Sequence, residues 1–278
     1  MVLESFINPS DARKSSWSLF FLGLIYSSVG ILLALIVFPE QASTYSIFLA
    51  TLAAAPLFVS LLKDEEALNI QLIEEKRNIF GNNLNIVSAF FFLFLGFTVS
   101  FSLWFSFLPE WALNDVFSEQ INNISSIRSI ITGNFLENTF FWTILQNNLR
   151  VLFFCLLFSF LYGAGAVLIL CWNASILGSA VGIFIREKIA EITGADYLSS
   201  ITVYLSNLPY GLGQYMFHGS FEIVAYFLAS IAGGIVSASI VRKRYKSSNF
   251  LKLIRNIVIL VTAAILFLII AAFIEVTF

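Results

Sequence analysis

Charged residues are scarce in this sequence. Asp, Glu, Lys and Arg make up 12% of the 278 residues, whereas a soluble domain carries about 25%. The formal net charge is −2, so the chain lacks the basic stripe that nucleic-acid binding requires. With 59% hydrophobic residues and a mean hydropathy of +0.89, the chain needs lipid rather than water as its solvent.

Cysteine and histidine are almost missing as well. Cys155 and Cys171 fall in one apolar run and would lie about 24 Å apart on a helix, too far for a disulfide bond. The single histidine, His218, and one nearby glutamate are too few for catalytic zinc, which takes three protein ligands. We therefore expect no metal, no cofactor and no enzymatic activity, and an intramembrane hydrolase is only a third hypothesis.

Long apolar runs dominate what is present, and crossing a bilayer takes about 20 such residues. The first run is too long for a signal peptide and is followed by no cleavage pattern, so we expect it to be retained. The runs 174–185 and 197–217 are ambiguous, because one is short and the other is interrupted around Pro209. Six runs qualify readily: 17–38, 41–62, 84–108, 149–172, 219–241 and 254–275.

The basic residues predict the orientation. Arg13 and Lys14 precede the first run, which places the N-terminus in the cytoplasm. The basic cluster at 242–246 marks another cytoplasmic boundary, so one of the two ambiguous runs must cross. If 197–217 crosses, 13 of the 15 Lys and Arg residues are cytoplasmic; if 174–192 crosses, the ratio is 11 to 4. We prefer the first arrangement, in which 174–191 is a short interfacial or re-entrant helix.

Both arrangements give the same fold class: an all-α polytopic bundle in the cell membrane with about seven transmembrane helices and an extracellular C-terminus. The predicted regions are a two-span hairpin with a cytoplasmic loop (1–83), a third span with an external amphipathic loop (84–148), a membrane core (149–246) and a C-terminal span (247–278).

The two loops are candidate partner sites. The cytoplasmic loop 63–83 combines charges with one apolar stripe, which fits either a solvated helical extension or a docking face. The external loop 109–148 has isoleucines at helical spacing, so it could lie on the membrane, cap the bundle or bind a partner. A homo-oligomer is a further expectation.

Polar residues inside spans are costly, which makes them candidate sites. His218 and Glu222 are four residues apart and share one helix face. Asn147, Asn148 and Arg150 lie at the same external level, and we predict that Arg150 or the asparagine pair contacts Glu222 or His218. The cluster is a structural clamp, or else a proton or ligand site.

Small residues allow helix backbones to approach closely, and a proline inside a helix marks a hinge. The residues predicted to pack or bend the helices are Gly163, Gly165, Asn173, Gly178, Pro209, Gly233 and Gly234.

An ordered set of short motifs between 140 and 241 resembles the Stage II sporulation protein M family. The opening residues 1–9 and two added N-terminal spans look like the archaeal branch of that family. One departure is Phe217, which stands before His218 where the family often has proline, so we expect the bend there to form differently. The motifs are Gln146-Asn147-Asn148, Gly163-Ala164-Gly165, Trp172-Asn173-Ala174, Leu177-Gly178, His218-Gly219-Ser220-Phe221-Glu222, Ala225-Tyr226 and Ala232-Gly233-Gly234.

The resemblance implies a role in membrane organisation. In spore-forming bacteria the family member is a scaffold that recruits two cell-wall-degrading partners during engulfment. An archaeal chain would lack that cell wall, so only the type of role is expected to carry over: a scaffold or anchor subunit of an envelope or membrane-remodelling complex. The alternative is a small-solute, ion or lipid transporter or channel built on the interrupted helices between Asn173 and Glu222. A polar cavity near Glu222 would favour transport, and a dry core the scaffold.

Overall fold

The computed structural model describes residues 16–75, 80–132, 137–162, 166–192, 196–243 and 250–277, and these ranges contain helices and no strand. The elements are α2 (Ser16–Val37), η1 (Pro39–Gln41), α3 (Ala42–Glu74), α4 (Phe80–Phe107), α5 (Glu110–Thr132), α6 (Glu137–Tyr162), α7 (Ala166–Ala190), α8 (Tyr197–Val241) and α9 (Phe250–Thr277).

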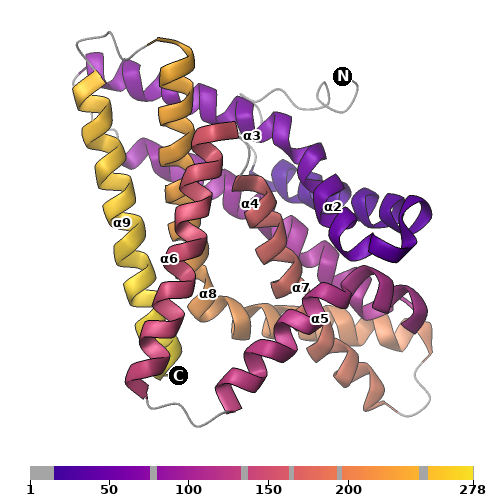
Figure 1. Ribbon diagram of the computed structural model, residues 1–278. Helices are drawn as coiled ribbons and strands as arrows, with labels where there is room; N and C mark the ends of the chain where they lie inside the picture. Colours follow the sequence, from indigo (N-terminus) through magenta and orange to yellow (C-terminus); the bar gives the residue numbers. More distant parts are fainter. Residues whose placement is uncertain are drawn as a thin grey trace.

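The helices pack as two groups. One group consists of α2, α3, α4 and α7, and the other of α6, the second half of α8, and α9 (Figure 1). Contacts of α8 with α3, α4 and α7 join the groups. One continuous core of buried apolar side chains runs through both, with Phe97 and Phe227 among its fully buried members.

Seven helices of the described ranges are long and apolar enough to span a membrane, as the sequence predicted. These segments are Trp17–Val37, Pro39–Glu74, Asn85–Phe107, Phe141–Leu161, Ala166–Ala190, Gly219–Val241 and Phe250–Thr277. The chain is therefore a multi-pass α-helical membrane protein.

The apolar run 149–172 does not form a single span. Helix α6 ends at Tyr162 and α7 begins at Ala166, so the predicted fourth span is wrong. Residues 163–165 lie outside the described part, and their sequence, with Gly163 and Gly165, is one that favours a change of backbone direction.

Helix α7 then has 25 residues and is about 37 Å long, which makes it long and apolar enough to cross as a full span. The predicted short interfacial or re-entrant helix at 174–191 is therefore wrong, and the structure favours the alternative in which 174–192 crosses. Arg186 shows how the ends of α4 and α7 are placed relative to one another. Its Nη1 donates to the carbonyl oxygens of Phe105 (3.2 Å) and Leu108 (2.9 Å), so the C-terminal ends of α4 and α7 lie at the same level.

Helix α8 is 45 residues long and contains Pro209. In Figure 1 it bends: its first half runs sideways, and its second half runs parallel to α6. Pro209 lies within the first half, where it removes the N–H for the bond to residue 205, and not between the two halves. The candidate span of α8 is Gly219–Val241, so our preferred prediction, that 197–217 crosses, is not supported.

Helix α5 is the amphipathic helix predicted in loop 109–148. One face is buried through Leu113, Val116 and Phe117, while Asn114 and Ser118 on the opposite face are exposed. The buried face packs on α2, α3 and α7, so this helix caps the bundle. Of the predicted isoleucine stripe, the side chains beyond residue 126 lie outside the described part.

Candidate functional site

A polar cluster joins α6 and α8 at the candidate site. The Asn148 Nδ2 donates to Oε1 of Glu222, and the Tyr226 hydroxyl donates to Oδ1 of Asn148 at 3.2 Å. Asn148 is only 5% exposed, so both functions of its amide are satisfied inside the protein. Among the contacts predicted from the sequence, the one between the asparagine pair and Glu222 is present and is made by Asn148.

Local helix geometry places these groups. Glu222 and Tyr226 are four residues apart on α8 and share one face, and α6 runs parallel to that face (Figure 1). Further along the same seam the Ser159 hydroxyl donates to the carbonyl oxygen of Ser230 at 2.6 Å. At Gly233 the two backbones come closest, because a Cβ there would overlap the carbonyl oxygen of Leu156.

The other predicted members are not brought into the cluster. Arg150 and Asn147 are exposed, and among the described residues no ion pair joins Arg150 to Glu222. His218 lies within helix α8, but its side chain is outside the described part. The cluster is therefore an amide–carboxyl–phenol arrangement rather than the arginine–glutamate pair that we considered.

Glu275 near the end of α9 belongs to the same region and was missed. Its carboxyl group lies within electrostatic range of the Glu222 carboxyl group and the Tyr226 hydroxyl group. The available signal was an acidic residue at the end of an otherwise apolar run, on a helix that could be expected to pack nearby. The pairing itself could not be predicted, because it depends on α8 and α9 lying side by side.

A second polar cluster lies at the opposite end of the bundle, on the part of α3 that continues past the apolar run. Glu65, Glu66 and Asn69 are fully buried there. Nη1 of Arg242, just beyond α8, pairs with Oε2 of Glu66 at 2.6 Å. The helical extension of loop 63–83 is thus present. The apolar stripe predicted there consists of Leu68, Leu72 and Ile79, but the buried face of the helix is more polar than that stripe. Ile79 is outside the described residues.

A third contact fastens α5 to two helices. Gln120 is fully buried; its Oε1 accepts from the Ser43 hydroxyl of α3 (2.9 Å), and its Nε2 donates to the Ser175 hydroxyl of α7 (3.2 Å). At the start of α5, Oε1 of Glu110 pairs with Nη2 of Arg186 at 2.5 Å. These polar contacts hold α5 across the ends of the spanning helices.

Two of the predicted packing glycines lie against neighbouring helices, and Asn173 bonds within its own helix. A Cβ at Gly178 would press on Phe101 and Thr98 of α4, and one at Gly234 on Leu62 of α3. Asn173 donates to the carbonyl oxygen of Ile169 within its own helix, at 2.8 Å.

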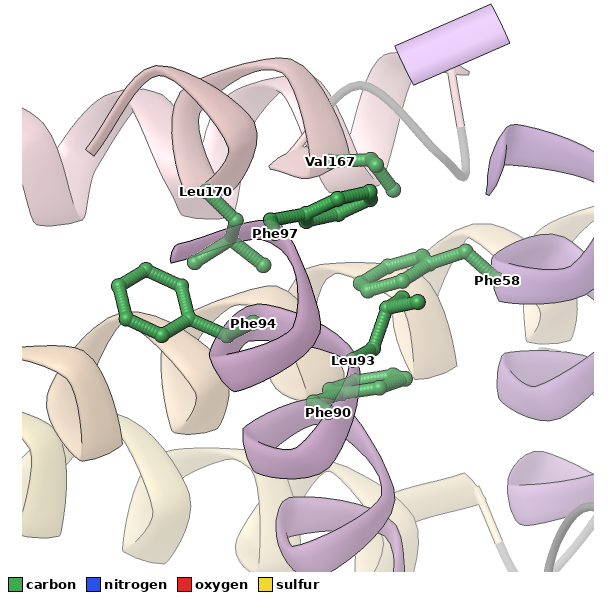
Figure 2. Close-up of a pocket in the computed structure, with 7 residues that line it drawn as sticks. All are labelled: Phe58, Phe90, Leu93, Phe94, Phe97, Val167 and Leu170. Atoms are coloured by element: carbon green, nitrogen blue, oxygen red, sulfur yellow. The ribbon is translucent and has the colours of Figure 1, made fainter. Parts of the chain in front are cut away.

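A small apolar cavity lies between α3, α4 and α7 (Figure 2). It has a volume of about 10 Å³, roughly the space of a single water, and an apolar pocket of this kind stays dry. In Figure 2 phenylalanines from α3 and α4 point into it beneath α7. The lining residues are Phe58, Phe90, Leu93, Phe94, Phe97, Val167 and Leu170.

The chemistry available in the described part is that of hydrogen-bonded clamps. No group of three or more His, Cys, Asp and Glu residues there is arranged to hold a metal ion. Cys155 and Cys171 are buried as free thiols on separate helices.

Together these features define a multi-pass helical membrane protein whose buried polar residues tie helices to one another. The sequence model of one family, Stage II sporulation protein M, matches residues 29–278, and the chain belongs to this family. The resemblance predicted from 140–241 is thus confirmed and extended to most of the N-terminal spans; the archaeal branch stays a prediction. No curated protein and no solved structure matches the chain.

Proposed function

We propose that this chain is a non-enzymatic membrane scaffold, or an anchor subunit, in an envelope or membrane-remodelling complex. The observation that carries the proposal is the closeness of the helix seams. At Gly96 (α2–α4), Gly178 (α4–α7) and Gly233 (α6–α8), even one added methyl group would overlap atoms of the facing helix. Helices in such contact cannot slide past one another without unpacking.

The dry core supports the same proposal over transport. Transporters bind their substrates near the bilayer midplane, where helices are interrupted. Here the cavity among α3, α4 and α7 is apolar and about 10 Å³ in volume. The proline-containing half of α8 packs along the last turns of α7, from Val181 onward, and is therefore near one end of the bundle rather than at its middle.

A scaffold needs a surface for its partner, and the α3 extension offers one. Its buried face is used inside the chain, whereas Lys63, Asp64, Gln71 and Glu74 are exposed. A partner at loop 63–83 would therefore meet a charged, mainly acidic face rather than an apolar stripe. The exposed face of α5 in loop 109–148 is the alternative surface, and it is polar, with Asn114 and Ser118 beside the acidic Glu119.

The experiment is affinity purification from crosslinked native membranes, with partners identified by mass spectrometry. The double variant Asp64→Lys, Glu74→Lys is compared with Asn114→Lys, Ser118→Lys on α5; all four positions are exposed, so both variants should fold. We expect one protein partner to be lost with the first variant and kept with the second. The absence of any stable partner of the unsubstituted chain would count against the scaffold.

A further inference from the structure

The first half of α8 (residues 197–217) exposes an uncharged face, on which large apolar side chains lie beside the polar residues Thr202, Ser206 and Gln214. Its inner side is covered, with Tyr204 and Gly211 buried. No Asp, Glu, Lys or Arg occurs between Tyr197 and Phe221, although a helix facing water normally carries charges on its outer face. The large apolar side chains on the exposed face, between 63% and 75% exposed, are Tyr197, Leu198, Leu205, Tyr210 and Phe217.

The contacts of this half-helix give its depth. Its inner side packs on Val181, Ile185 and Ile189 of α7, and the Tyr204 hydroxyl donates to the carbonyl oxygen of Val99 on α4 at 3.3 Å. All four of these neighbours belong to candidate spans. Val181 to Ile189 rises about 12 Å along α7, so the half-helix lies within the last 12 Å of the spanning helices.

Helix α5 at the same end provides a contrast. It begins beyond the end of α4, where Arg186 pairs with Glu110, and its outward residues include Asn114, Ser118 and Asn122. Two non-spanning segments at one end of the bundle thus present different surfaces. Helix α5 also packs on the spans, through Phe117 against Phe105 of α4 and through Gln120 against Ser175 of α7, so the two segments differ in the side chains that they expose.

We propose that the exposed face of residues 197–217 is embedded in lipid, at the boundary between headgroups and acyl chains on the α5 side of the membrane. Interfacial helices are immersed by about 5–10 Å, which agrees with the depth given by the contacts. Tyrosines prefer this level because their rings are apolar and their hydroxyls are polar. The surface continues the lipid-facing surface of the spans and does not depend on the proposed scaffold role.

The lack of charge on this face predicts how its immersion depends on the charge of the lipid. Most interfacial helices carry Lys or Arg and gain from anionic lipid. This face has none, so its immersion should be the same in neutral and in anionic bilayers. A second copy of the chain or a soluble partner on this face would instead exclude lipid from it.

The test uses nitroxide labels on variants that each add one cysteine to the chain, in vesicles of phosphatidylcholine with and without phosphatidylglycerol. Leu205→Cys and Phe217→Cys are compared with Asn114→Cys and Ser118→Cys; Cys155 and Cys171 are buried, so the unsubstituted chain measures background labelling. We expect molecular oxygen to relax the labels at 205 and 217 more than a water-soluble nickel complex does. The order should reverse at 114 and 118, and neither result should change with phosphatidylglycerol.

Two outcomes would overturn the proposal: relaxation of the 205 and 217 labels mainly by nickel, or protection of both from oxygen and nickel alike. A measurement on the unsubstituted protein guards against variants that do not fold. A carbene precursor carried on the phospholipid acyl chain should modify the peptide containing 197–217 but not the one containing 110–122. An unmodified 197–217 peptide would also refute immersion.

Discussion

Replacing Gly233 by alanine tests whether the α6–α8 seam is as close as the structure indicates. The added Cβ would overlap the carbonyl oxygen of Leu156 and lie 3.1 Å from the amide nitrogen of Phe160. Both are backbone atoms of α6, so no side chain can rotate to make room. The helices must separate, and the cluster at Asn148 and Glu222 lies on the same seam.

The expected size follows from two opposing effects. Over-packing of a close contact costs about 1–3 kcal/mol, and alanine gains up to about 1 kcal/mol over glycine as a helix former. Because the overlap is with backbone, we place the cost at the upper end and expect a net loss of about 2 kcal/mol. In a chain of this size that lowers the Tm by about 4–8 °C.

The assay is thermal unfolding in detergent, followed by tryptophan fluorescence and checked by size-exclusion chromatography. Gly213→Ala is the matched control: Gly213 is on the same helix and is exposed, and a Cβ added there would meet no side chain and no other helix within 4 Å. Its Tm should stay the same or rise. If Gly233→Ala is as stable as Gly213→Ala, the close approach of α6 and α8 is wrong.

Three further changes have defined outcomes. Asn148→Ala leaves a carboxyl and a phenol without their amide partner and should cost about 1–3 kcal/mol in the same melting assay, whereas exposed Asn147→Ala should stay within about 0.5 kcal/mol; equal effects would refute the clamp. Gln120→Leu should speed proteolysis and hydrogen exchange in α5, because Ser43 and Ser175 lose their shared partner, and exposed Asn122→Leu should not. Asp196 caps α8 by accepting from the Ser199 N–H at 2.8 Å, which holds the pKa of this carboxyl below its usual range. Its contribution is therefore present above the ordinary pKa of Asp, about 3.9, and is lost as the pH falls through the lowered pKa. Asp196→Ala should speed amide exchange in the first turn of α8 at neutral pH and have no effect in acid; a difference that persists in acid would contradict the cap.

The membrane class and most spans could be predicted from sequence because hydropathy is a local property. The division between α6 and α7 could not, because the glycines at 163 and 165 fit equally well in a packed helix and in a break. Arg186 misled the choice between the two ambiguous runs, 174–192 and 197–217. The positive-inside rule counts it as cytoplasmic, but the structure pairs it with Glu110 and two carbonyl oxygens of α4, where its charge is compensated.

The candidate site was partly predictable, because local sequence patterns place two of its residues. Asn148 and Glu222 both lie near the start of spans that the charge pattern made parallel, so their contact could be expected. Glu275 and Gln120 are brought to their partners by helices that are distant in sequence, and no local pattern reports such packing. Arg150 was favoured because of its charge, but its side chain is exposed.

The order of the helices in the two groups has a consequence for biosynthesis. Helix α6 packs mainly on α8 and α9, whereas α7, which follows α6 in the chain, packs mainly on α4. During translation α6 therefore enters the bilayer before its principal partners exist. A chain that stops short of α8 leaves Asn148 facing lipid without the Glu222 and Tyr226 groups that satisfy it, at a cost of several kcal/mol for each unpaired group. Helix α8 thus completes the hydrogen bonding of a span that is made before it.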